Sequence, residues 1–296
     1  MSALPLVCTP GDPRGIGPEV ACKALVAHPR DAVLCGDRAA IEEWASRTGL
    51  QARLLEAEAG VEPIEVRAIR TAVREIRSGR ARGLVTGPIH KGRLHAAGVD
   101  WIGHTEFLGQ LSNVPHPVMA FVGGRLRIAL VTVHLPLRAV ADALTTDLVA
   151  HTIRVADRAL RRDLGLATPR IAVCGLNPHA GDGGVLGSEE RLVIEPAVRL
   201  VQQEGVLVDG PVSAETAFRR AGDGVVDLVV AMYHDQGLAP LKLVDFGRSV
   251  NWTLGLPFVR TSVDHGTADD IAGKGLADAS SMQAALDLAD QLTSPL

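Results

Sequence analysis

Residues 231–275 read AMYHDQGLAPLKLVDFGRSVNWTLGLPFVRTSVDHGTADDIAGKG, and this stretch decides the fold. The apolar run VVDLVVAM, which leads into it, is typical of a buried parallel strand. The strand runs directly into Tyr233 and His234, and ligands of open α/β sheets bind just beyond such carboxyl ends. Chemistry is therefore expected at this turn. The later segment VDHGTADDIAGKG is expected to open a helix that starts at Gly266 and Thr267.

The rest of the chain alternates short apolar strands with amphipathic helices. Strands are expected at LPLVCTP, AVLCG, GLVTGPI and PRIAVCG, and a hairpin is expected across Gly123–Gly124. Helices are expected at about 37–47, 66–77 and 146–164, and another begins near Ser188, where acidic residues suit the helix dipole. This alternation predicts an α/β fold with a largely parallel sheet. The hairpin and the long helix after it suggest a second lobe that begins near residue 134.

Composition excludes several classes of function. A net charge of −4 argues against a polyanion-binding surface, so the arginine stripe on the helix at 66–77 is interpreted as a solvated face and no nucleic-acid partner is expected. The four cysteines are scattered among apolar neighbours, which suits reduced thiols in the cytoplasm. No apolar run approaches the roughly 20 residues of a membrane span, and the N-terminus lacks the pattern of a signal peptide. A cytoplasmic protein without a membrane partner is expected.

Three histidines follow separate apolar strands, in VTVHLP, GLNPHAG and AMYHDQG. Each alone would more often be a hydrogen-bonded structural residue, but His134, His179 and His234 together could form a His₃ metal site with open positions. The glycine-rich loops are less specific. GDPRGIGPE lacks the G-x-G-x-x-G spacing of a dinucleotide loop, and GDGGVLG has no lysine for a Walker A loop.

Taken together, the motifs resemble the 4-hydroxythreonine-4-phosphate dehydrogenase family, whose members are NAD-dependent enzymes of pyridoxal 5′-phosphate biosynthesis. The resemblance runs from the first strand to the last helix and is carried by GDPRGIGPE, TGPIHKGRLHAAG, GHTEFLG, VTVHLPL, GLNPHAGDGGVLGSEE, MYHDQGLAPLK and NWTLGLPFVRTSVDHGTADDIAGKG. DHGTADDIAGKG also resembles the adenosine-binding loop of the β-decarboxylating dehydrogenases. This second resemblance implies that NAD, with NADP as an alternative, binds without a Rossmann loop.

The resemblance implies an isocitrate/isopropylmalate dehydrogenase-like fold with two lobes. We expect residues 1–133 and 261–296 to form the first lobe, which carries the cofactor loop. Residues 134–260 would form the second lobe, with metal and substrate residues and dimer contacts. It further implies a homodimer whose active site lies at the subunit interface, and a phosphorylated small-molecule substrate.

The resemblance also implies roles for single residues. His134, His179 and His234 are expected to ligate the metal. Zinc is the first expectation, and cobalt, manganese or magnesium are alternatives. Cofactor contacts fall to His265, Gly266, Thr267, Asp270 and Gly273. Substrate contacts fall to His104, Thr105, Lys242, Asn251 and Arg260, and Lys242 is also assigned a catalytic role.

The sequence leaves some alternatives open. Glu215 stands where the family is expected to have aspartate, so the role of that carboxylate is undecided, as is the identity of the general base. Paralogues that oxidise other phosphorylated four-carbon acids or dihydrodiols are a second interpretation, and a non-catalytic protein that binds a metal or phosphate ligand is a third. GHTEF and the intact LGLPFVRTSVDHGTA favour the vitamin-pathway enzyme.

Overall fold

The chain divides into two compact units, and the computed structural model describes residues 4–100, 103–245 and 247–294 of it. Unit 1 combines Met1–Pro117 with Val250–Leu296, and unit 2 is Val118–Ser249. One unit contains both ends of the chain, and the boundaries between the units lie earlier than the 134 and 261 suggested by the sequence. The pairing of strands explains the difference. The hairpin at 118–130 pairs with a strand of unit 2, whereas the strand at 250–254 pairs with one of unit 1.

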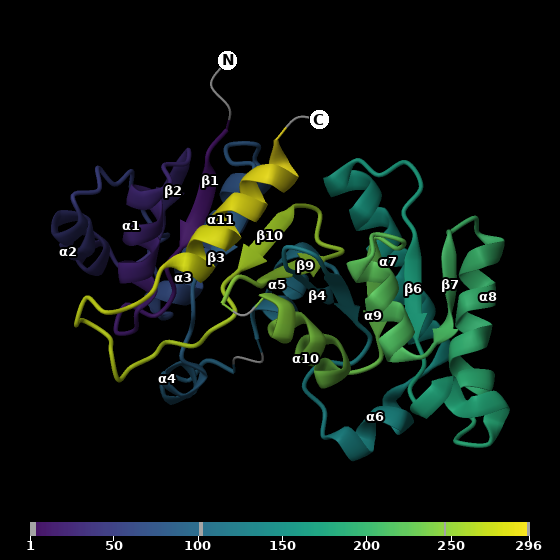
Figure 1. The fold of residues 1–296 in the computed structure, drawn as a ribbon. Coiled ribbons are helices and arrows are strands. Elements are labelled where there is room, and N and C mark those ends of the chain that lie inside the picture. The colour runs from purple at the N-terminus through teal and green to yellow at the C-terminus, as the bar shows by residue number, and fades with distance from the viewer. Residues whose placement is uncertain (1–3, 101–102, 246, 295–296) are drawn as a thin grey trace. The chain divides into compact units, whose positions relative to one another are not determined.

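Unit 1 is a mostly parallel sheet with helices packed against it (Figure 1). Its strands pair in the order β2-β1-β3-β10-β9, and the β9–β10 pair is antiparallel. The strands are β1 (Leu6–Thr9), β2 (Ala32–Leu34), β3 (Gly83–Thr86), β9 (Val250–Leu254) and β10 (Val259–Ser262). The helices are α1 (Gly17–Ala27), α2 (Arg38–Thr48), α3 (Ile64–Arg77), α4 (Lys91–Ala96), α5 (His104–Ser112) and α11 (Ser280–Thr293).

Helix α3 shows how the apolar pattern builds the core of unit 1. Val66, Ile69 and Val73 recur at helical spacing, and all three are buried, with Ile69 and Val73 packed in one cluster with residues of β1 and β3. Burying each such side chain contributes about 1.5–3 kcal/mol. Two arginines of this helix pair with carboxylates of the preceding segment, Arg70 with Glu62 and Arg74 with Glu58. The predicted amphipathic helix is therefore confirmed, and its arginine face is partly neutralised.

Unit 2 is also an α/β layer. Its strands pair in the order β4-β5-β8-β6-β7, with β4 antiparallel to β5 and the other pairs parallel. The strands are β4 (Val118–Val122), β5 (Arg127–Leu130), β6 (Ile171–Cys174), β7 (Val208–Val212) and β8 (Leu228–Ala231). The helices are α6 (Leu137–Ala143), α7 (Thr146–Leu164), α8 (Glu195–Gln203), α9 (Ala214–Gly222) and α10 (His234–Asp245), with short helical segments at Pro178–Gly184 and Glu190–Ile194. The expected α/β class is confirmed.

Local signals set the bounds of α7, the longest helix of unit 2. The Thr145 side chain accepts a hydrogen bond from the Leu148 N–H and caps the start. Gly165, with φ 65°, ends the helix in the left-handed conformation that favours glycine. The helix therefore spans Thr146–Leu164, as predicted from the sequence.

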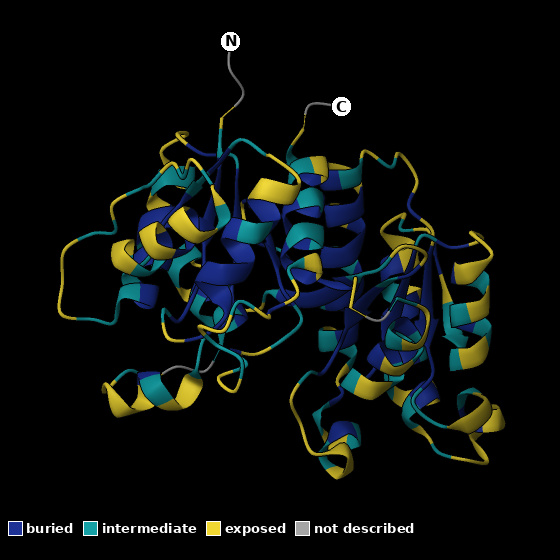
Figure 2. Ribbon diagram, turned by 60° about the vertical axis from the view of Figure 1, so that its left-hand side comes forward, coloured by how far each residue is buried: buried dark blue, intermediate teal, exposed yellow. Residues whose placement is uncertain are grey.

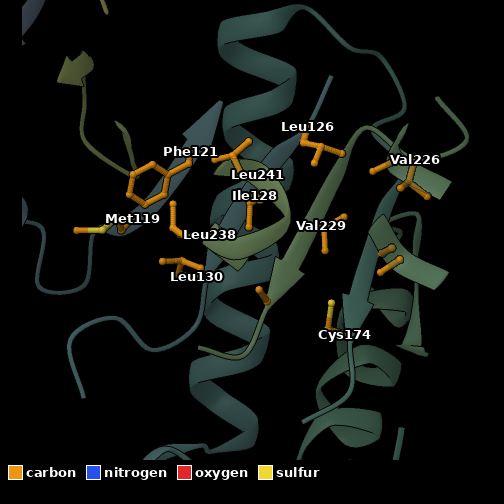
Figure 3. Close-up of a cluster of buried hydrophobic side chains, with 14 residues drawn as sticks. Met119, Phe121, Leu126, Ile128, Leu130, Cys174, Val226, Val229, Leu238 and Leu241 are labelled. Atoms are coloured by element: carbon orange, nitrogen blue, oxygen red, sulfur yellow. The ribbon is translucent and has the colours of Figure 1, made fainter. Parts of the chain in front are cut away.

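The core of unit 2 gathers apolar side chains from the sheet and from α10 (Figure 3). Ile128 and Leu130 of β5 and Val229 of β8 are buried beside Leu238 and Leu241 of α10. Strand β8 and most of β5 are buried, whereas exposed residues lie on the outer faces of the helices (Figure 2). This core fixes the carboxyl ends of β5 and β8 and so positions the turns that follow them. Among the described helices, none combines the length and the apolar character needed to cross a membrane.

Candidate functional site

Two cavities of unit 2 border Tyr233, the residue just before α10. One, of about 530 Å³, is lined by His134, His234 and apolar side chains. The other, of about 610 Å³, is lined by His179 and Glu215 among others. The histidines follow β5, β6 and β8, which are neighbours in the parallel part of the sheet. The predicted placement of three histidines beyond strand carboxyl ends is thus what the structure shows.

His134 and His234 lie close together. Their ring centroids are 6.0 Å apart, and the ring planes are tilted by 38°. Two imidazoles that share one zinc ion at Zn–N distances near 2 Å have centroids roughly 5–6 Å apart, so this pair is nearly at ligand spacing. If Nε2 of His234 binds the metal, Nδ1 is the remaining ring nitrogen, and it lies 2.8 Å from Oδ1 of Asp235, within hydrogen-bond distance. A carboxylate in this place orients a ligand imidazole.

His179 stands on an unusual turn in the second cavity. From His179 to Gly183 every residue has a positive φ, between 44° and 81°. Three of these residues are not glycine, and the left-handed conformation costs each of them about 1–2 kcal/mol. A strained conformation of this kind persists only where its surroundings hold it.

Glu190 supplies that support. Its buried carboxylate accepts hydrogen bonds from the backbone N–H groups of Leu176 (2.8 Å) and Asn177 (2.7 Å) and from the Asn177 side chain (3.0 Å). A side chain at Gly181 would collide with it, because an added Cβ would lie 2.6 Å from a Glu190 oxygen. From the sequence, only a helix-dipole role is expected for Glu190, one of the acidic residues that follow Ser188. The carboxylate in fact organises the loop that carries His179.

The structure brings together two of the three predicted metal ligands. In the described ranges no group of three or more His, Cys, Asp or Glu side chains is close enough to hold one ion. His134 and His234 form a pair, and His179 lines the neighbouring cavity. Imidazole donors suit Zn²⁺, Co²⁺ or Mn²⁺, so the donor chemistry of the pair fits the predicted metal. The three-histidine site stays a prediction.

Gln236 was not anticipated from the sequence. Its side-chain oxygen accepts the Met232 N–H at 2.7 Å, and its side-chain nitrogen donates to the Gly175 carbonyl at 2.7 Å. It therefore ties the end of β8 to the end of β6, where His234 and His179 follow. Only its position in MYHDQG, next to the histidine motif, could have indicated this role.

Unit 1 holds a buried cation, Arg260 of β10, which is 2% exposed. Within the described residues its hydrogen bonds go to uncharged oxygens, those of Thr86 (2.6 and 3.1 Å), Thr253 (2.9 Å) and Asn251 (3.2 Å). Burial lowers the pKa of the guanidinium to about 9, against the opposing effect of Glu106, so it remains charged at neutral pH. A buried charge among neutral partners is suited to binding an anion.

His104 lies near this arginine, at the start of α5. Burial lowers its pKa well below the usual value, and the positive charges of Arg260 and Lys91 lower it further. The imidazole is therefore neutral at physiological pH. The next residue, Thr105, is buried. Of the predicted substrate residues, His104, Thr105, Asn251 and Arg260 thus belong to unit 1, and Lys242 belongs to α10 of unit 2.

The predicted cofactor residues lie on one loop between β10 and α11. They are His265, Gly266, Thr267, Asp270 and Gly273. The helix expected to start at Gly266 is wrong, since residues 263–279 form turns and irregular backbone. Ala268, Gly273 and Gly275 have φ values of 44°, 80° and 75°, which a right-handed helix cannot contain. Asp269 and Asp270 of this loop are exposed, whereas Thr267 is buried.

Known proteins resemble this chain over nearly its whole length. A 4-hydroxythreonine-4-phosphate dehydrogenase from Enterobacter sp. (strain 638) is 41% identical over 315 residues, with 96% of each chain covered. The crystal structure of a 4-hydroxythreonine-4-phosphate dehydrogenase from Klebsiella pneumoniae superposes with a TM-score of 0.90 at 35% identity and covers 99% of this chain and all of its own. Isocitrate dehydrogenase from Methylococcus capsulatus shares the fold, with a TM-score of 0.52 at 16% identity over 98% of this chain and 85% of its own.

A family model gives the same result. The model described as pyridoxal phosphate biosynthetic protein PdxA matches residues 33–289, which include each residue predicted to contact metal, substrate or cofactor. The isocitrate dehydrogenase-like fold expected from the motifs is confirmed, and so is the resemblance on which it rested. The chain belongs to the PdxA family of pyridoxal phosphate biosynthetic proteins.

Proposed function

We propose that this protein is a 4-hydroxythreonine-4-phosphate dehydrogenase, which oxidises the secondary alcohol of 4-phosphooxy-L-threonine with NAD⁺. The alcohol carbon loses a hydride to the nicotinamide and the hydroxyl loses a proton. The resulting 3-keto acid then loses CO₂ to give 3-amino-1-hydroxyacetone 1-phosphate. Beyond family membership, one observation carries this proposal. Arg260 is a buried guanidinium whose hydrogen bonds go to hydroxyl and amide oxygens, and a dianionic substrate would supply the negative charge that these partners lack.

The residues of unit 1 would bind and orient the substrate. Arg260 takes an anionic group, and Asn251 holds the guanidinium in place through its side-chain oxygen. His104, which burial keeps neutral, can accept or donate one hydrogen bond without adding a charge. Thr105 adds a hydroxyl donor. From unit 2, Lys242 supplies a second cation, suited to negative charge that develops as CO₂ leaves.

The metal and the cofactor would supply the remaining chemistry. A divalent ion held by His134, His179 and His234, foremost Zn²⁺, would lower the pKa of the alcohol and polarise the ketone, and NAD⁺ held by the loop at 263–279 would accept the hydride. We assign NAD⁺ rather than NADP⁺ because the carboxylate of Asp270 is exposed on that loop and would repel a 2′-phosphate. Hydrogen bonds from Thr267 and from Arg93 lower the pKa of the neighbouring Asp269, whose charge Arg93 offsets.

The test is a steady-state assay of purified protein with 4-phosphooxy-L-threonine, in which NADH formation and CO₂ release are followed together. The two products should appear in equal amounts, and NADP⁺ should support at least roughly tenfold lower kcat/KM. The unphosphorylated amino acid is the matched control. It should react poorly, because a cationic pocket left without its anion loses several kcal/mol of binding. Equal activity on both substrates would contradict the proposal, and turnover of a dihydrodiol alone would favour the paralogue.

We further propose that the protein is a homodimer whose two active sites are each formed by both subunits. We also propose that it is cytoplasmic, because its four cysteines are buried and unpaired, as suits a reducing compartment. His134→Ala and His179→Ala subunits should each be inactive alone. Because His134 and His234 pair within one chain, a shared site would take these two from one subunit and His179 from the other. Mixed dimers should then regain up to about half of the activity per dimer, since one of two sites is complete. Subunits mixed after unfolding and refolding, with sedimentation to verify the dimer, provide the measurement. Mixed dimers without activity would place all ligands within one chain.

A further inference from the structure

The predicted cofactor loop of unit 1 is held by polar contacts from distant segments. The first of these lies at its start, where the Ile16 N–H donates to the Thr267 carbonyl at 3.0 Å. Gly15 allows this approach, because an added Cβ would lie 2.9 Å from the Thr267 side chain. Further along, the Arg93 guanidinium bridges Asp269 of the loop (2.5 Å) and buried Asp12 (2.8 Å). The glycine-rich GDPRGIGPE motif thus helps to position the loop.

At the far end of the loop, one ammonium group binds two main-chain carbonyls. Lys23 of α1 donates to the carbonyls of Gly275 (3.0 Å) and Ala277 (2.9 Å) and to the carboxylate of Glu19 (2.7 Å). These three acceptors match the three N–H donors of a lysine. Glu19 is fully buried, and the oxygen that pairs with Lys23 also accepts the Ala277 N–H at 2.9 Å. Glu19 and Lys23 therefore close a small network around the backbone of residues 275–277.

Lys23 fixes the conformation of the loop, which the stability of the fold alone does not require. Two acceptors of Lys23 are main-chain carbonyls of a segment without helix or strand, whose conformation depends on contacts with side chains of other segments. A loop that must be ordered by its ligand binds more weakly, because ordering costs about 1–2 kcal/mol per residue. Lys23 fixes the loop in advance, so it should contribute to affinity for whatever the loop binds.

We infer that Lys23, together with Glu19, is a positioning residue that sets the affinity for NAD⁺ by holding residues 264–277 in their binding conformation. The inference rests on the proposed function, which assigns that loop to the cofactor. Lys23 itself does not have to contact NAD⁺, since its donors are already used by Glu19, Gly275 and Ala277.

The experiment compares Lys23→Met with wild-type protein by calorimetric titration with NAD⁺ in the absence of substrate. We expect the dissociation constant to rise roughly tenfold, since several residues must then be ordered on binding. In steady state the KM for NAD⁺ should rise with it, while kcat and the KM for the substrate stay unchanged. Amide hydrogen exchange should become faster at 264–277 and not in β3 or β10.

Arg30→Met is the matched control. Arg30 forms an ion pair with Asp287 at 2.8 Å in the same unit, and its side chain is 29% exposed, close to the 31% of Lys23. It does not touch the loop, so its loss should lower thermal stability without changing NAD⁺ affinity. Lys23→Arg keeps the charge but replaces three independent donors by a planar fork. We expect an intermediate, roughly threefold rise in the dissociation constant for this variant. If Lys23→Met does not fold, Lys23→Arg still tests the inference.

The outcomes separate the two proposals. If wild-type protein does not bind NAD⁺, the proposed function fails and the inference fails with it. If wild-type protein binds NAD⁺ and both Lys23 variants bind it equally well, only the inference is overturned. A rise in the NAD⁺ dissociation constant as large for Arg30→Met as for Lys23→Met would also overturn it, because general loosening of the unit would then explain the effect.

Discussion

Replacing Arg260 by methionine is expected to lower kcat/KM for the phosphorylated substrate roughly 10³-fold, since truncating one partner of a buried charge pair costs several kcal/mol. The free energy of unfolding should change by less than about 2 kcal/mol, because an apolar side chain of similar volume replaces a buried cation. The lost contacts with Thr86 and Thr253 are hydrogen bonds from a charged donor, and their loss is offset because a charge no longer has to be buried. Steady-state kinetics and urea denaturation of the same preparation measure both quantities.

A second arginine of unit 1 provides the control for this experiment. Arg82 is also largely buried, with a side chain 13% exposed, but it pairs with a carboxylate, that of Asp290. Arg82→Met should therefore destabilise the protein and leave kcat/KM nearly unchanged. If Arg260→Met instead lowered stability while the kinetics stayed intact, Arg260 would be a structural residue and the proposed anion contact would be wrong.

Replacing His234 by alanine is expected to reduce kcat by more than about 10³-fold, because polarisation by a metal contributes several kcal/mol to the oxidation. Bound metal per subunit, measured by elemental analysis after dialysis, should fall in parallel. Affinity for NAD⁺ should remain within about twofold of wild type, since the residues proposed to bind the cofactor lie on the loop at 263–279, which does not include His234. His134→Ala and His179→Ala should behave in the same way.

His28→Ala is the control for these variants. His28 follows α1, is exposed, and closes the helix through its backbone N–H rather than its ring. This variant should keep its metal and its activity. Full activity in wild-type protein freed of metal by a chelator would refute the metal site, and so would stoichiometric metal in the alanine variants.

Individual elements could be predicted where the signals are local. Helix α7 was expected at its observed bounds because a threonine cap and a left-handed glycine flank a regular apolar pattern. The hairpin of β4 and β5 was expected because two apolar runs flank Gly123 and Gly124. The segment after Ser262 was misjudged as a helix, since glycines within it take positive φ and its contacts lie outside the segment. Propensity yields to tertiary contacts in such a loop.

The residues of the candidate site were recognisable from the sequence, because each motif is a run of adjacent residues. The sequence by itself thus determined the α/β class, the family and the identities of the histidines. Only the tertiary structure decided how they are supported. Lys23 binds a carbonyl 252 residues away, and Arg260 meets Thr86 across a separation of 174. Hydrophobic period and helix caps are properties of neighbouring residues, whereas such contacts depend on strand order, which no local pattern encodes.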